Sequence, residues 1–118
     1  MANTAVTSTT SIQKISDLRG QLIIPVVEET TQRYLGFFRY DDVEKYKTEV
    51  STCKDLLSRV DPSGNTRFTY VDPHDSPIEA LRKIGQWKTD FLPLVDHTGV
   101  YTGTVDIKGL SELLESNS

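Results

Sequence analysis

The feature that most constrains the fold of this sequence is an internal duplication. The run IIPVVEE around Pro25 matches FLPLVDH around Pro93 at an offset of 68 residues. The run YLGFF around Gly36 matches YTGTV around Gly103 at an offset of 67, and SIQK matches SPIE at an offset of 65. The drift is what insertions in a helix and a hairpin would produce. A unit of about 60 residues is marginal on its own, so we expect the two copies to pack together.

Each copy carries the same succession of strand signals. Continuous apolar runs rich in β-branched residues predict buried strands at 23–27 and 91–95. The proline within each run favours a sheet edge or a strand start. Return strands are predicted at 34–38 and 100–105, and a further strand at 67–71. Residues 5–7 are interpreted either as a short edge strand or as part of a disordered tail.

Helix starts are indicated by capping residues. Ser76 precedes Pro77 and Glu79, which is the pattern of an N-cap, a first-turn proline and a capping box. Thr52 and Asp55 have the same capping-box spacing. A short helix is predicted over 41–46, and a final helix carries Leu110, Leu113 and Leu114.

These signals predict an α+β fold, two β-α-β-β-α repeats packed as one pseudo-twofold module. The expected organisation is a flexible tail over 1–10, a first repeat over 11–49 with a short first helix, a connecting helix and loop over 50–66, and a second repeat over 67–115.

Composition excludes several classes of protein. With 13 basic and 17 acidic residues the net charge is −4, which argues against a nucleic-acid binder and a polybasic membrane anchor. No apolar run approaches the roughly 20 residues that span a bilayer, and the N-terminus lacks the apolar segment of a secretory signal. One cysteine cannot form a disulfide within the chain, and with two histidines it makes a poor zinc site. We therefore expect an intracellular protein, cytoplasmic or nuclear.

The duplicated unit resembles the CBS domain, named for cystathionine β-synthase. The second copy carries the resemblance in VDPHDSPIEALRKI (71–84) and LPLVDHTGVYTGTVDIKGLSELL (92–114), and the first copy in IPVVEETTQRYLGFFRYDDVEKY (24–46). A tandem pair of such domains is called a Bateman module. The layout is similar to the last two repeats of the γ subunits of AMP-activated protein kinase and to related fungal regulators.

The resemblance implies an adenosine-containing ligand in the cleft between the copies. The family motif is a glycine, two apolar residues, Ser or Thr, two further residues and Asp. In the first copy the motif begins at Gly36, with Arg39 at the hydroxyl position and Asp42 at the Asp position. In the second copy Asp106 and Gly109 fill these positions, so the resemblance implies that ribose recognition is lost there.

The candidate ligand-binding residues follow from that motif. Asp42 is expected to accept the ribose hydroxyls and Arg39 to hold phosphate. The apolar-Pro strands are expected to offer backbone groups to the base: Ile24, Pro25, Val26, Leu92, Pro93 and Leu94. The alternatives are that Asp42 is an acid favoured at a helix N-terminus and Arg39 a solvated strand-end residue. Trp87 is interpreted as a core or inter-copy contact.

The functional expectation is a non-catalytic regulatory module for energy sensing that binds AMP, ADP or ATP and requires no cofactor. No catalytic or metal-binding residue is predicted, because no known nucleotide-loop, nucleophile or metal motif occurs. The expected partners are a kinase or other regulated enzyme and a second copy in a homodimer, with no nucleic acid or membrane. The alternative is a nucleotide-silent module for dimerisation or protein interaction, which the altered second motif favours and the intact Asp42 disfavours.

Overall fold

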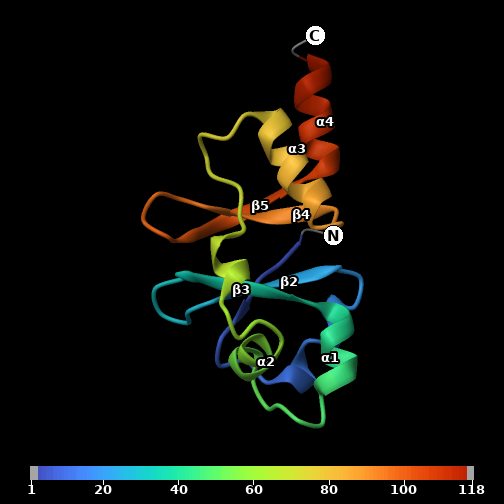
Figure 1. Ribbon diagram of the computed structural model, residues 1–118, viewed down its shortest axis with the longest axis vertical. Coiled ribbons are helices and arrows are strands. Elements are labelled where there is room, and N and C mark those ends of the chain that lie inside the picture. Colours follow the sequence, from blue (N-terminus) through green and yellow to red (C-terminus); the bar gives the residue numbers. More distant parts are fainter. Residues whose placement is uncertain (1–2, 117–118) are drawn as a thin grey trace.

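The computed structural model of the protein describes residues 3–116. Two small sheets lie next to each other in the middle of the molecule, and the helices cover their outer faces (Figure 1). Helices α1 (Tyr40–Tyr46) and α2 (Cys53–Val60) lie outside one sheet, and α3 (Pro77–Gln86) and α4 (Ile107–Ser116) outside the other. The stacking gives an elongated molecule of 49 × 28 × 24 Å. The predicted α+β module of two packed repeats is therefore confirmed.

The first sheet has three strands and the second has two. Strand β2 (Ile23–Val27) lies between β1 (Val6–Thr7), which runs parallel to it, and β3 (Tyr34–Arg39), which runs antiparallel. In the second sheet β4 (Phe91–Val95) pairs antiparallel with β5 (Tyr101–Asp106). The two main hairpins, β2–β3 and β4–β5, are the duplicated part of the sequence.

The hairpins also share a β-bulge. The register shifts between Val26 and Val27 in one and between Leu94 and Val95 in the other, which leaves one extra residue in each return strand. The next residue along is Gly36 with φ of 138° or Gly103 with φ of 152°. Residues with a side chain rarely adopt this conformation, so the bulge explains why both copies have glycine there.

The apolar core is divided into two clusters. The first belongs to the first repeat and includes Ile24, Phe38 and Leu56. The second cluster combines residues of both repeats, because Ile23, Tyr34 and Phe37 pack with the second repeat's Val71, Ala80, Ile84, Phe91, Leu92, Val95 and Leu110. Neighbouring residues Phe37 and Phe38 therefore point to opposite faces of β3, as period-two strand geometry requires. The second repeat completes its core with side chains of the first.

Hydrogen bonds between the hairpin ends join the repeats. The Tyr34 N–H donates to the Gly99 carbonyl at 2.9 Å, and the Tyr101 N–H donates to the Gln32 carbonyl at 3.0 Å. Arg33 and Val100 form an antiparallel bridge between these two bonds. At the other end of β3, the Phe37 and Trp87 rings lie edge to face with centroids 5.2 Å apart. Trp87 is thus an inter-repeat contact, as the sequence predicts.

The N-caps predicted at Thr52 and Ser76 are confirmed, but only Thr52 has a complete capping box, because the Glu79 carboxylate pairs with Arg82 and not with the Ser76 N–H. The Thr52 hydroxyl accepts the Asp55 N–H at 3.2 Å, and the Asp55 carboxylate accepts the Thr52 N–H at 3.3 Å, which completes a capping box. The Ser76 hydroxyl accepts the Glu79 N–H at 3.2 Å, and Pro77 is the first residue of α3.

The prediction of a strand over 67–71 is wrong. Residues Asn65–Phe68 form a 3-10 helix, η3, and only Val71 makes an isolated parallel bridge, to Leu94. The Asp61 carboxylate accepts the N–H groups of Asn65 and Thr66, and this local capping holds the segment in a helical turn.

The N-terminal segment also differs from a regular repeat. Between β1 and β2 the first copy has two 3-10 turns, η1 (Ile12–Lys14) and η2 (Ser16–Leu18), where the second copy has the ten-residue helix α3. Of the two interpretations of residues 5–7, the structure has the short strand, β1 over Val6–Thr7. A flexible tail over the whole of 1–10 is therefore not observed, and residues 1–2 lie outside the described part of the chain.

Candidate functional site

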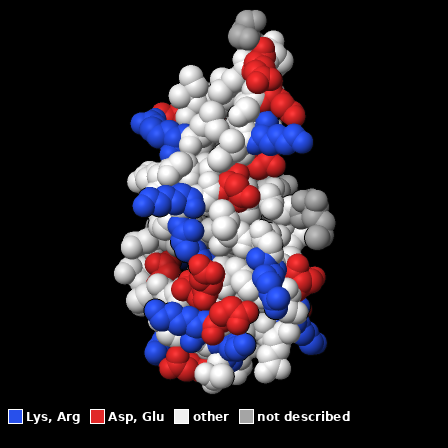
Figure 2. All heavy atoms as spheres, turned by 90° about the vertical axis from the view of Figure 1, so that its right-hand side faces the viewer, with Lys and Arg blue, Asp and Glu red and all other residues white. Residues whose placement is uncertain are grey.

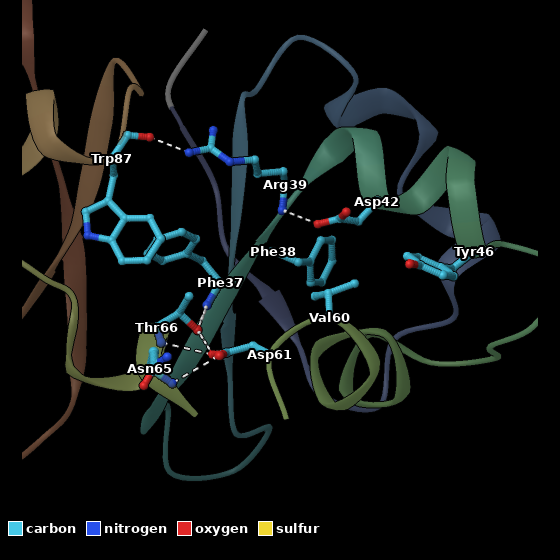
Figure 3. A pocket seen from close by; sticks show the side chains of 10 residues that line it. All are labelled: Phe37, Phe38, Arg39, Asp42, Tyr46, Val60, Asp61, Asn65, Thr66 and Trp87. Atoms are coloured by element: carbon cyan, nitrogen blue, oxygen red, sulfur yellow. Dashed lines mark hydrogen bonds between the residues drawn. The ribbon is translucent and has the colours of Figure 1, made fainter. Parts of the chain in front are cut away.

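A cavity of about 380 Å³ lies between the two repeats, where β3 passes into α1 (Figure 3). Three parts of the chain line it: the β3–α1 segment, the end of α2 with η3, and the end of α3. The lining residues are Phe37, Phe38, Arg39, Asp42, Tyr46, Val60, Asp61, Asn65, Thr66 and Trp87. Its volume is within the range of about 300–1,000 Å³ that is typical of small-molecule sites.

Arg39 connects the two repeats across this cavity. It is the last residue of β3 and the N-cap of α1, with extended backbone angles of φ −85° and ψ 146°. Its Nη2 donates a hydrogen bond to the main-chain carbonyl of Trp87, 48 residues away (Figure 3). A guanidinium has five N–H donors, so this bond leaves others for an anion. Arg39 is therefore a half-buried cross-repeat contact and not a freely solvated side chain.

Asp42 serves as a helix cap and also lines the cavity. Its Oδ2 accepts the Arg39 main-chain N–H at 3.2 Å, which stabilises the first turn of α1. No described residue donates a hydrogen bond to its Oδ1. The helix-acid interpretation is therefore correct as far as Oδ2 is concerned, and Oδ1 is left for another donor.

The floor of the cavity is held by a hydrogen-bond network centred on Thr66. Its buried hydroxyl accepts the Phe37 N–H at 3.1 Å and donates to Asp61 Oδ2 at 2.6 Å. The Tyr34 hydroxyl, on the same strand as Phe37, donates to the carbonyls of Thr66 and Thr69 at 2.8 and 3.0 Å. These bonds fix η3 against β3 on one side of the inter-repeat cleft.

The carboxylate of Asp61 is stabilised in its charged form. Burial raises its pKa, but hydrogen bonds from the Thr66 hydroxyl and from the N–H groups of Thr66, Asn65 and Gly64 outweigh burial and lower the pKa below the ordinary aspartate value of 3.8. With Asp42, the cavity thus carries two carboxyl groups and the guanidinium of Arg39.

Several of these residues were not predicted as site residues. The DPSGN run at 61–65 falls in the predicted connecting helix and loop, and its acid followed by glycine, asparagine and threonine is also a capping pattern for the next turn. Tyr46 and Val60 reach the cavity because α1 and α2 contact each other. No local pattern indicates that arrangement.

The structure does not bring the six strand candidates together with Arg39 and Asp42. They lie in β2 and β4, and none of them lines the cavity. Five are buried and Leu94 is half-buried; the six are Ile24, Pro25, Val26, Leu92, Pro93 and Leu94. The predicted contact of these strands with a base stays a prediction.

The corresponding position in the second repeat is a helix cap. Asp106, at the end of β5, accepts the Gly109 N–H through Oδ1 at 2.7 Å. Neither residue lines the cavity of Arg39 and Asp42. The acid that replaces the family's hydroxyl residue thus caps α4.

Among the described residues there is no metal cluster, no reactive thiol and no helix that could span a membrane. Across 3–116 no three histidine, cysteine, aspartate or glutamate side chains lie together as a metal site would require. Cys53 is buried, and burial raises the pKa of its thiol to about 11, so the thiol is neutral. None of the helices in this part of the chain has the length and apolar character to cross a membrane.

Comparison with known proteins gives a family and a set of similar folds. A sequence profile of the CBS domain matches residues 54–116. No curated protein sequence matches the chain.

Among solved structures, the chain is similar to CBSX2 in complex with AMP, with a TM-score of 0.73 and 17% identity over 97% of this chain and 88% of that one. It is similar to a CBS domain pair/ACT domain protein from Thermotoga maritima, with a TM-score of 0.71 and 14% identity over 99% and 93%. It is also similar to CbpB in complex with c-di-AMP, with a TM-score of 0.63 and 17% identity over 95% and 77%.

Proposed function

Since the chain belongs to the CBS-domain family, we propose that it is a regulatory CBS pair that binds an adenine nucleotide in the cavity between its repeats. The observation that carries the proposal is the placement of Arg39 and Asp42 at one cavity formed by both repeats. A ligand there contacts both halves of the molecule at once, as a regulatory ligand must if it is to change their relative packing.

Each part of a nucleotide has a matching group in the cavity. The free Oδ1 of Asp42 accepts a ribose hydroxyl, and the remaining N–H groups of Arg39 hold a phosphate. The rings of Phe37 and Trp87 offer an apolar wall for the base (Figure 3). The two solved relatives with AMP and c-di-AMP support this class of ligand, since adenine nucleotides are what those proteins hold.

The link between Arg39 and Trp87 offers a route from ligand to partner. A phosphate that attracts the Arg39 guanidinium competes with the Trp87 carbonyl, which belongs to the other repeat. Nucleotide binding would then change how the repeats pack. The recipient in this proposal is a regulated protein such as a kinase, and the module acts as a non-catalytic, intracellular energy sensor in a homodimer.

A nucleotide-silent interaction module is the second candidate. The observation that favours it is the second repeat, where Asp106 caps α4 and Gly109 has no carboxylate to offer. The use of one Asp42 oxygen and one Arg39 nitrogen within the protein also favours it.

Calorimetric titration with AMP, ADP, ATP and S-adenosylmethionine separates the two candidates. We expect binding of at least one adenine nucleotide by the natural chain and loss of that binding in Asp42→Ala. Asp106→Ala is the matched control, because it also removes an acid that caps a helix after a return strand but does not line the cavity. Each substitution costs about 1 kcal/mol of stability through the lost cap.

Two outcomes would contradict the sensor proposal. Absence of heat with every ligand at millimolar concentration would leave the interaction module as the function. Equal loss of affinity in both variants would show that capping, and not contact with ribose, is what Asp42 contributes.

Light scattering at high protein concentration tests the proposed homodimer. A mass equal to that of one chain would exclude the homodimer.

A further inference from the structure

A second hollow lies on the opposite edge of the junction between the repeats. It has a volume of about 120 Å³ and lies beside the ends of the two hairpins, which point to the left in Figure 1. Its lining residues come from both repeats and from η3: Arg33, Tyr34, Arg67, Phe68, Tyr70, Val95 and Gly99. None of them lines the cavity of Arg39 and Asp42.

The charge of this hollow is unusual for an acidic protein. Two arginines line it and no carboxylate does, although the chain has more acids than bases. Figure 2 shows another face of the molecule, the one on the right in Figure 1. On that face, acidic and basic groups are interspersed. Arg33 and Arg67 are exposed, and within residues 3–116 neither side chain makes an ion pair or a hydrogen bond.

Nearby acids do not neutralise these arginines. The Asp96 carboxylate, next to Val95, accepts bonds from the Thr98 N–H, the Thr98 hydroxyl and the Val100 N–H. Asp61 borders a neighbouring hollow together with Arg67 but forms no ion pair with it, because its oxygens accept bonds from η3. Arg33 instead lies over Gly99, where its Nη2 is 3.6 Å from the position that a Cβ would occupy. Its guanidinium therefore spans from one hairpin to the other.

An exposed aromatic side chain adjoins the two arginines. Phe68 is 78% exposed, more than any other large apolar side chain in the described part of the protein. Tyr70 is held beside the hollow by its edge-to-face contact with Tyr34, with centroids 6.0 Å apart. Arginine and aromatic side chains are enriched at protein interfaces and dominate their binding energy.

The size of the hollow limits its occupant. At about 120 Å³ it is well below the range of about 300–1,000 Å³ that encloses a nucleotide-sized molecule. A single side chain fits it, with the rest of the ligand lying on the surface. Two unpaired guanidinium groups favour carboxylates, and the adjacent Phe68 favours an apolar side chain.

From these observations we propose that the surface formed by Arg33, Arg67, Phe68 and Tyr70 docks an acidic peptide segment of a partner protein, with one apolar or aromatic side chain placed against Phe68. The acidic side chains pair with Arg33 and Arg67, which belong to different structural elements. This docking surface is separate from the nucleotide cavity, so it stands whether or not a nucleotide binds.

Fluorescence anisotropy with a labelled short peptide of aspartate and glutamate around one phenylalanine tests the proposal. We expect binding that weakens with added salt and falls roughly tenfold or more in the double variant R33A/R67A. Phe68→Ser should weaken binding several-fold, and the same peptide without phenylalanine should bind less tightly. All three side chains are exposed, so these variants are expected to fold.

The matched control is the double variant R19A/R82A, which removes the same charge from two exposed arginines elsewhere. It should bind the peptide within about twofold of the natural chain. The proposal is overturned if the natural chain does not bind the peptide, or if the control loses as much affinity as R33A/R67A. It is also overturned if equimolar inorganic phosphate displaces the peptide, because the hollow would then be a site for free anions.

Discussion

The two repeats share a hairpin but differ in what covers it. Both hairpins have the bulge and its positive-φ glycine, and each turn is closed by an acid, Glu28 or Asp96, that accepts hydrogen bonds from threonine. Strand β3 is largely buried, whereas β5 is half-buried or exposed along its length. The difference arises because η3 and α2 pack on β3, where Thr66 and Leu57 lie over Gly36.

The space around the bulge glycines, Gly36 and Gly103, shows this difference in packing. A Cβ on Gly36 would lie 2.6 Å from the Thr66 hydroxyl oxygen, whereas a Cβ on Gly103 would have nothing within 4 Å. The duplicated hairpin is thus a common scaffold, and the linker makes one of its two copies into the wall of a cavity. A site can therefore be present in one repeat and absent from the other without any change in the hairpin.

The largest expected effect comes from Gly36→Ala, compared with Gly103→Ala. Both variants force a side chain into a left-handed conformation, at a cost of about 1–3 kcal/mol. Gly36→Ala adds a clash with Thr66 worth about 1–3 kcal/mol more. Urea denaturation should therefore show a clearly larger loss in the free energy of unfolding for Gly36→Ala. Equal losses would mean that the linker does not press on β3.

A smaller effect is expected from Thr66→Val, with Thr66→Ser as its control. Valine has the shape of threonine but leaves the buried Phe37 N–H without an acceptor, at a cost of about 1–3 kcal/mol. Serine keeps the hydroxyl and loses only a methyl group. Thermal denaturation should therefore give a clearly lower Tm for Thr66→Val than for Thr66→Ser. The reverse order would show that the methyl group, and not the hydroxyl, holds η3 on β3.

The smallest effect concerns the pH dependence of stability. Because the pKa of Asp61 is lower in the folded protein than its ordinary value, Asp61 stabilises the fold above about pH 4, and this contribution is lost as the pH falls through the folded pKa. The difference in unfolding free energy between the natural chain and Asp61→Asn should shrink between about pH 5 and pH 2. A difference that stays constant over this range would exclude a role for the charge of Asp61 in holding the linker.

Much of the fold could be predicted because the signals are local. The hairpins and the starts of α2 and α3 follow from period-two patterns and from capping residues three positions apart, as at Thr52 and Asp55. The strand predicted at 67–71 failed because capping by Asp61 outweighs the strand preference of this short segment.

The candidate site was predicted only in part. Arg39 and Asp42 were found because a family motif places them three residues apart in one segment. Thr66, Asp61 and Trp87 were missed as site residues, since they reach the cavity only when the linker and the second repeat pack on β3.

By itself, the sequence determined that this protein is a duplication of one hairpin-and-helix unit, because repeated local patterns specify repeated local structure. Only the tertiary structure decided which copy has a cavity and where unpaired arginines meet an exposed aromatic ring. The physical reason is that these features depend on contacts between distant residues, such as Arg39 with Trp87 at a separation of 48 and Phe37 with Thr66 at a separation of 29. Such contacts follow from how the two copies and their single linker pack, which no local pattern encodes.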